Sequence, residues 1–246
     1  MRYEASRTAI FEKRAMDSVE RSVEGFAIFK GLSKADLNGL LSASRLNRYQ
    51  KLARIFQQGD PAERFFVLID GYVQAVKTSP KGEEIVVRYV SPGELFGVAP
   101  AIGLTHYPAT AVAVVDAIAL AWPSTSWPSL AAKYPQITSF ALKSVGARLQ
   151  EAHERVTELA TEEVEQRIAR MLIRLAAQAG RATEEGIEIE FPLRRQDVAQ
   201  LTGTTMHSAS RVLSRWQERG FIHGGHQHIV VHDAPALARI AEEGRS

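Results

Sequence analysis

The sequence contains no cysteine. This absence excludes disulfide bonds, cysteine-ligated iron–sulfur clusters, structural zinc sites of the cysteine type and thiol nucleophiles. The sequence also lacks an apolar run of the roughly 20 residues that a membrane-spanning helix needs. Residues 1–22 carry charges throughout and have no apolar core of the kind found in secretory signals. We therefore expect a cytoplasmic protein without a membrane partner.

Net charge is also scarce, because the formal charge is only +2 over 246 residues. The distribution of charge is more informative than its total. Between residues 194 and 223 the acidic residues are Asp197 and Glu218, whereas the basic residues are Arg194, Arg195, Arg211, Arg215 and Arg219. The C-terminal third thus holds a basic segment. The length favours two domains of about 100 to 150 residues each.

The stretch from Arg48 to Trp127 has the pattern of an all-β domain. Five of its glycines recur every 10 to 12 residues, at Gly59, Gly71, Gly82, Gly93 and Gly103. Between them lie segments rich in β-branched and aromatic residues, at 65–69, 72–76, 84–90 and 109–122. Residues 79–82, Ser-Pro-Lys-Gly, have hairpin chemistry, and leucines at helical spacing predict a short helix over 34–44. Such regular turns predict a barrel or a sandwich.

A long helix is predicted from Pro135 onward. Apolar residues recur in it at alternating steps of three and four, at Leu142, Val145, Leu149, Ala152, Val156 and Leu159. This heptad seam predicts a parallel homodimer. The alternative is a helix that packs only on its own barrel. A hinge near Thr161 separates it from a second amphipathic helix over 164–179, which opens the last domain.

The segment 195–216 carries the pattern of a helix-turn-helix. Val198 and Leu201 form the inward side of a first helix. Gly203 stands where the turn needs a positive φ, and Thr205 is a favourable N-cap for the second helix.

The second helix of this motif has two different faces. Its apolar stripe consists of Ala209, Val212, Leu213 and Trp216, and its polar stripe of His207, Ser210, Arg211 and Ser214. Arginine can fork onto guanine O6 and N7 in the major groove, and serine and histidine offer short hydrogen-bonding groups. We predict DNA contacts from Thr205, His207, Ser208, Ser210, Arg211 and Arg215. The alternative is a solvated face on an ordinary helical hairpin.

Residues 221–231, FIHGGHQHIVV, predict a two-stranded wing with a turn at its two glycines. A wing after the hairpin favours the DNA-binding interpretation. Its vicinity is rich in histidine, with His223, His226, His228 and His232. We expect no metal site, because the strand period places His228 and His232 opposite the apolar residues, on the solvent or phosphate side.

The order of these parts resembles the family of the cyclic AMP receptor protein and the fumarate and nitrate reduction regulator. The resemblance extends from about Phe26 to Ala241. The segments that carry it are FQQGDPAERFFVLIDGYVQAV (56–76), SPGELFG (91–97) and RRQDVAQLTGTTMHSASRVLSRWQERGFI (194–222).

The resemblance implies that His207, Ser210 and Arg211 occupy the base-reading positions of the recognition helix. The oxygen-responsive branch carries Glu, Ser and Arg there, so a half-site related to TTG is implied, with the base read by His207 left open. Histidine within GTTMHSASR is similar to regulators of denitrification that respond to nitric oxide.

The resemblance also has implications for the small-molecule signal that the barrel could bind. Cyclic-nucleotide binders of the family carry a Glu for the ribose and an Arg for the phosphate at places that correspond here to Val98 and Pro108. Neither can compensate a buried phosphate, so we expect no cyclic AMP, and the lack of cysteine argues against an iron–sulfur cluster. Haem stays open, with His106 and His153 as the histidines outside the DNA-binding domain.

We therefore predict an α+β protein. It has a jelly-roll β-barrel of the cyclic-nucleotide-binding type (22–134), a dimerisation helix (135–162) and a winged helix-turn-helix (163–246). The predicted function is that of a homodimeric, non-enzymatic transcription regulator, an activator, that partners double-stranded DNA and RNA polymerase. Two alternatives stay open. One is an enzyme built on a cupin-like barrel, which would need several metal ligands, although the barrel segment supplies only His106 as a histidine ligand. The other is a barrel that mediates protein contacts and binds no ligand.

Overall fold

The computed structural model describes residues 22–225 and 227–242. The chain forms two compact units. Among the described residues, one unit comprises 22–73 together with 90–146, and the other comprises 74–89 together with 147–225 and 227–242. Within the described ranges, no helix combines the length and apolar character required to cross a membrane. His226 lies outside the described residues.

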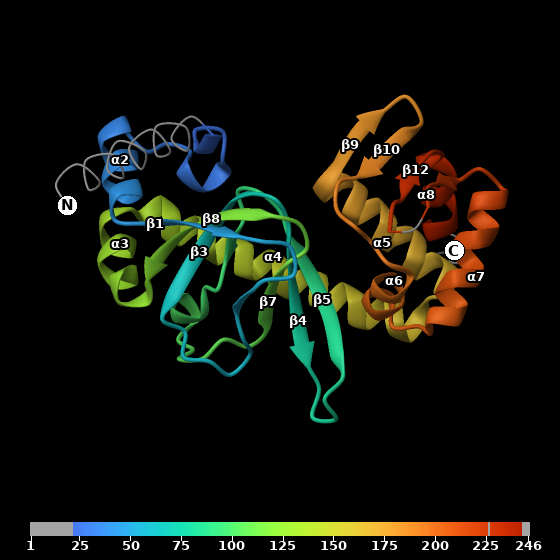
Figure 1. Ribbon diagram of the computed structural model, residues 1–246, viewed down its shortest axis with the longest axis horizontal. Coiled ribbons are helices and arrows are strands. Elements are labelled where there is room, and N and C mark those ends of the chain that lie inside the picture. Colours follow the sequence, from blue (N-terminus) through green and yellow to red (C-terminus); the bar gives the residue numbers. More distant parts are fainter. Residues whose placement is uncertain (1–21, 226, 243–246) are drawn as a thin grey trace. The chain divides into compact units, whose positions relative to one another are not determined.

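Two four-stranded sheets account for the β-rich part of the chain (Figure 1). One has the order β1-β8-β3-β6, with strands Arg45–Tyr49, Ala117–Pro123, Arg64–Asp70 and Leu95–Phe96. The other has the order β2-β7-β4-β5, with strands Arg54–Phe56, Thr110–Ala113, Val73–Thr78 and Glu84–Val90. The pairs β1/β8, β3/β8, β3/β6 and β2/β7 are all antiparallel. The predicted antiparallel, jelly-roll type of domain is confirmed.

Strand β3 shows why an apolar run without alternation forms a strand here. Successive side chains of a strand point to opposite faces, and both faces of β3 are covered. Phe65, Val67 and Ile69 join a core cluster with the helices, whereas Phe66 and Leu68 join a second cluster with strands of both sheets. Burial on both faces explains why residues 65–69 read as continuous hydrophobic sequence.

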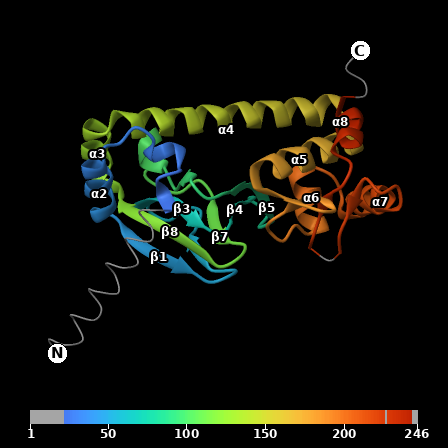
Figure 2. The same cartoon turned by 90° about the horizontal axis from the view of Figure 1, so that it is seen from above.

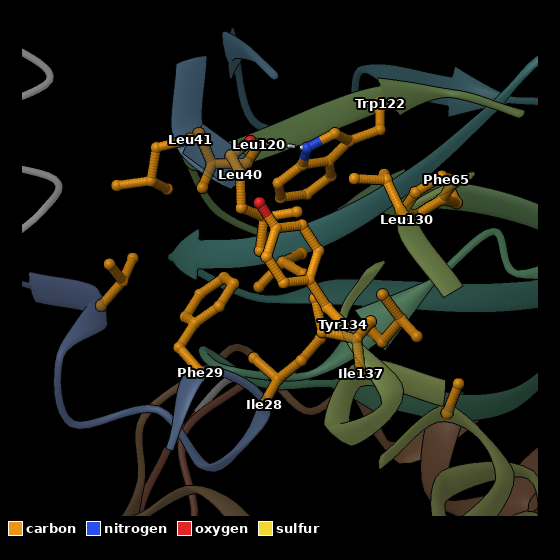
Figure 3. Close-up of a cluster of buried hydrophobic side chains, with 14 of the residues drawn as sticks. Ile28, Phe29, Leu40, Leu41, Phe65, Leu120, Trp122, Leu130, Tyr134 and Ile137 are labelled. Atoms are coloured by element: carbon orange, nitrogen blue, oxygen red, sulfur yellow. Dashed lines mark hydrogen bonds between the residues drawn. The ribbon is translucent and has the colours of Figure 1, made fainter. Parts of the chain in front are cut away.

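The first of these clusters joins sheet and helices (Figure 3). Its helical members come from the 3-10 helix η1 (Ala27–Phe29), α2 (Lys34–Ser42), α3 (Trp127–Lys133) and the start of α4 (Pro135–Thr161). The indole N–H of Trp122 donates a hydrogen bond to the Leu40 carbonyl at 3.0 Å, which satisfies the polar atom of a ring that is 1% exposed. Strand β8 and helix α2 are thereby joined by a directional bond within the apolar core.

Two turns follow the predicted chemistry. Gly82 has φ +84° and donates to the Ser79 carbonyl at 2.9 Å, which closes the turn between β4 and β5. Gly71 has φ +80°, and a side chain there would collide with the Asp116 carbonyl. The run 109–122 contains two strands, β7 and β8, because a turn through Asp116 interrupts it.

The second unit contains helices α5 (Val164–Ala179), α6 (Arg195–Thr202), α7 (Met206–Glu218) and α8 (Ala234–Glu242). Its antiparallel sheet has the order β11-β12-β10-β9, with strands Ile222–His223, Val230–Val231, Gly186–Ile189 and Gly180–Thr183. The predicted wing, β11 and β12, is thus part of a larger sheet. The helices pack around a core that includes Ile168, Leu172, Val198, Trp216 and Leu237, each 0% exposed.

Residues 74–89 belong to the same compact unit as the helix-turn-helix. The side-chain amide of Gln200 donates to the Glu84 carbonyl at 2.9 Å and accepts from the Val86 N–H at 3.1 Å. The Tyr89 ring stacks on Phe191 with centroids 4.1 Å apart. Strand β5 therefore supplies both peptide groups and a buried aromatic ring to this unit.

Candidate DNA-binding site

The turn between α6 and α7 is built as the sequence predicts. Gly203 adopts φ +60°. The N–H groups of Gly203 and Thr204 donate hydrogen bonds to the Gln200 and Ala199 carbonyls at the end of α6. The Thr205 hydroxyl oxygen accepts from the Ser208 N–H at 3.1 Å and so caps α7. The same hydroxyl donates to Ser208 Oγ at 3.0 Å. The hydroxyls of Thr205 and Ser208 therefore both stabilise the N-terminal end of α7.

Helix α7 separates an apolar face from a polar one. Ala209, Val212, Leu213 and Trp216 are at most 3% exposed. On the other side, His207 and Arg211 are exposed, and Ser210 and Ser214 lie half-buried beside them. The structure thus brings the four residues of the predicted reading stripe together on one accessible surface.

Arg195 contributes to this surface although the sequence did not single it out as a site residue. Its guanidinium donates to the Ser210 carbonyl at 2.8 Å and to Ser214 Oγ at 3.0 Å. A further donor reaches Gln217 Oε1 at 3.4 Å. Arg195 begins α6, so these bonds tie the first helix of the motif along the length of the second and place a cation beside the reading stripe.

Arg215 lies apart from this stripe. Its guanidinium forms an ion pair with Glu165 of α5 at 2.7 Å, and both side chains are about one-third exposed. A partly exposed pair of this kind contributes little to stability. Arg215 can therefore reach a phosphate only by sharing or leaving Glu165, unlike Arg211.

A buried acid fixes the start of α6. Asp197 is 2% exposed, accepts from the Arg194 N–H at 2.9 Å and pairs with the Arg194 guanidinium at 2.7 Å. The hydrogen bonds that the Arg194 guanidinium donates to the Asp197 carboxylate raise the pKa of Arg194. This arrangement compensates the buried carboxylate and leaves the positive charge of Arg194 bound at the helix end.

The wing carries exposed histidines with local partners. His228 Nε2 lies 2.7 Å from Glu188 Oε1, and His232 Nδ1 lies 2.6 Å from the Glu185 carbonyl. The hydrogen bond with His228, followed by the nearby Arg181, lowers the pKa of Glu188. Across the part of the chain that the structure describes, no three His, Asp or Glu side chains are placed to hold a metal ion.

Helix α4 is one continuous helix, Pro135–Thr161 (Figure 2), and it contains all the residues of the predicted heptad seam. Large apolar side chains on it are exposed in the single chain: Leu142 by 62%, Leu149 by 58%, Val156 by 66% and Leu159 by 47%.

The positions that would bind a cyclic nucleotide lack suitable groups. Val98 is 6% exposed and lies within the apolar core cluster, and Pro108 is exposed. His106 is exposed with Nδ1 2.9 Å from Thr105 Oγ1, and His153 is exposed on α4. None of these residues presents a charged group to a buried phosphate.

Comparison with known proteins gives a match for each of two domains. Residues 46–134 match the cyclic nucleotide-binding domain family, and residues 166–240 match the Crp-like helix-turn-helix domain family. The cyclic AMP receptor protein of Thermus thermophilus is 29% identical over 219 residues, which span 89% of this chain and 98% of that protein. The fumarate nitrate reduction regulatory protein of Klebsiella oxytoca is 22% identical over 80% of this chain and 78% of its own.

A solved structure shares the fold as well. The structure of FixK2 from Bradyrhizobium japonicum has a TM-score of 0.70 at 21% identity and covers 80% of this chain and 96% of its own. Both domain matches, the named relatives and the arrangement of barrel, long helix and winged motif point to one family of DNA-binding regulators, not to an enzyme. The chain belongs to the family of the cyclic AMP receptor protein and the fumarate and nitrate reduction regulator.

Proposed function

We propose that this transcription regulator works in the cytoplasm as a homodimer that reads a palindromic DNA site with α7. The carrying observation is the polar face of α7, where His207, Ser210 and Arg211 stand accessible over a helix that is fully packed on its other side. Only the N-terminal residues of a recognition helix reach base edges, and these three lie within its first two turns.

The dimer proposal rests on α4. Its exposed apolar residues recur at heptad spacing, and a second copy of the same helix would cover them. Two recognition helices would then meet successive major grooves on one face of the duplex. The three-part division into barrel (22–134), dimerisation helix and winged motif is part of this proposal, as is contact with RNA polymerase in an activating role.

The proposed signal acts through the barrel and is not cyclic AMP. The support is chemical, since Val98 and Pro108 cannot bind a ribose or neutralise a phosphate. Because histidine stands at position 207 within GTTMHSASR, we propose a signal linked to nitric oxide or redox state and a role in denitrification. Haem bound through His106 or His153 is one way to sense such a signal.

The first test measures sequence-specific binding. Arg211→Ala should weaken binding to the specific site by about 1 to 3 kcal/mol and relax its sequence preference. Arg45→Ala removes the same charge from an exposed position on β1 and serves as the control. Equal affinities for specific and scrambled duplexes, before and after the Arg211 change, would refute the proposal.

A second experiment addresses the signal. Selection of bound DNA from a random pool, with and without haem and nitric oxide, reports the site, its symmetry and its effector together. Selection that strengthens only with haem or nitric oxide supports the proposed signal. Equal selection under all conditions, together with no thermal shift by haem, nitric oxide or nucleotides, would favour a regulator that is constitutive or controlled by protein contacts.

A further inference from the structure

One large apolar side chain of α7 is not buried. Met206, the first residue of the helix, is 56% exposed, whereas the other apolar residues of α7 are at most 3% exposed. Met206 was not among the residues predicted to contact DNA.

Only part of the Met206 side chain packs against the rest of the protein. Met206 borders a cavity of about 280 Å³ between α7 and the wing, where its apolar neighbours include Leu193, Leu213 and Ile229. More than half of the side chain nevertheless faces outward. A long, unbranched thioether in this position is able to adjust its shape to an apolar partner.

The position of Met206 places that side chain at the reading end of the helix. Met206 and Ser210 are four residues apart and therefore lie on the same side of α7, one turn from each other. Helical side chains lean toward the N-terminus of their helix, and the N-terminal residues of a recognition helix contact base edges. Met206 thus lies next to the polar stripe of α7, at the N-terminal end of the helix.

Resting on the proposed function of α7, we infer that Met206 is a further specificity-determining residue, which contacts the C5-methyl group of a thymine. The base edges in the major groove present hydrogen-bond donors and acceptors and a single apolar group, the thymine methyl. The methionine side chain has no donor and only a weak sulfur acceptor. Its match in the groove is therefore a T·A pair, with the thymine methyl packed against the thioether.

The test removes that methyl group and nothing else. Each thymine of the operator selected by the wild-type protein is replaced by deoxyuridine, in one half-site and then in both, and Kd is measured by fluorescence anisotropy. At one thymine per half-site, the replacement should weaken wild-type binding about fourfold, and about fifteenfold when both halves are changed.

Variants assign the effect to the side chain. Met206→Ala should bind thymine and deoxyuridine duplexes equally at that position, and Met206→Leu should retain most of the discrimination. Leu104→Ala, which truncates an exposed apolar residue in the other unit, should leave it unchanged. Unaltered melting temperatures would show that the variants fold.

Two results overturn the inference and leave the proposed function intact: no thymine whose methyl group affects wild-type affinity, or the same discrimination in Met206→Ala as in the wild type. Failure of the wild-type protein to select any site is a different result, which contradicts the proposed function itself.

Discussion

Replacement of Val156 by aspartate tests whether α4 is a dimer interface. Val156 is 66% exposed in the single chain, and it shares the heptad seam with Leu142, Leu149 and Leu159. Full burial of such a side chain contributes about 1.5 to 3 kcal/mol, so covering the exposed part of Val156 in both copies contributes about 2 to 4 kcal/mol. The variant loses this contribution and adds two facing carboxylates that lack a cationic partner in the seam.

The expected result is a dimer dissociation constant at least about 100-fold weaker, since each 1.4 kcal/mol is a factor of ten. Stability of the single chain should change by no more than about 0.5 kcal/mol, because the position is exposed there. Ala147→Asp adds the same charge at an exposed position away from the seam and is the matched control. Sedimentation velocity over a concentration series measures the constant. Equal dimerisation by Val156→Asp and Ala147→Asp would refute the reasoning.

Three further substitutions test local features of the second unit. Thr205→Ala removes the cap of α7 and should lower the free energy of unfolding by about 1 kcal/mol in urea titrations, with Thr205→Ser close to wild type; equal stabilities would contradict the cap. Tyr89→Phe removes a buried hydroxyl that has no hydrogen-bond partner among the described residues and should raise the free energy of unfolding by about 1 kcal/mol at pH 7. Burial, with nearby Asp197 as a second cause, raises the pKa of Tyr89. The Tyr89 phenol ionises near pH 10 in the unfolded chain but stays protonated in the folded chain, so the free energy of unfolding falls above that pH. This fall should be less steep in Tyr89→Phe. The same dependence of the free energy of unfolding on pH in both proteins, between pH 8 and 11, would contradict the raised pKa. His228→Ala should raise the pKa of Glu188 toward its ordinary value in an NMR titration, since the His228 hydrogen bond is the largest cause of its lowering; no change would place the cause elsewhere.

The winged motif was largely predictable because its signals are local. Helix α5 begins and ends at the expected residues, 164 and 179, since an amphipathic stripe and a following glycine mark it. Gly203 and Thr205 fixed the turn and the cap in the same way. Sequence patterns of this kind act over three to seven residues, which is the range of helix and turn chemistry.

Other features depend on partners far along the chain. Strand β9 escaped prediction because every residue of Gly180–Thr183 is exposed and no apolar alternation marks it. Strand β10 was also missed, although Ile187 and Ile189 alternate with Glu188 and give a short strand signal. The pairing of Arg215 with Glu165 joins residues 50 positions apart, so the pattern of α7 alone could not reveal it. Tyr89 reads as an ordinary strand residue, and its stacking on Phe191 becomes visible only in three dimensions.

The central claim is that two copies of α7 are held at a fixed separation by paired α4 helices and enter the same duplex. The most direct measurement varies the distance between the half-sites of the selected operator. An insertion of about five base pairs, half a helical turn, rotates one half-site to the opposite face of the DNA and should weaken binding at least about 100-fold, to the level of an isolated half-site. Full affinity for the operator with the half-turn insertion would contradict the account.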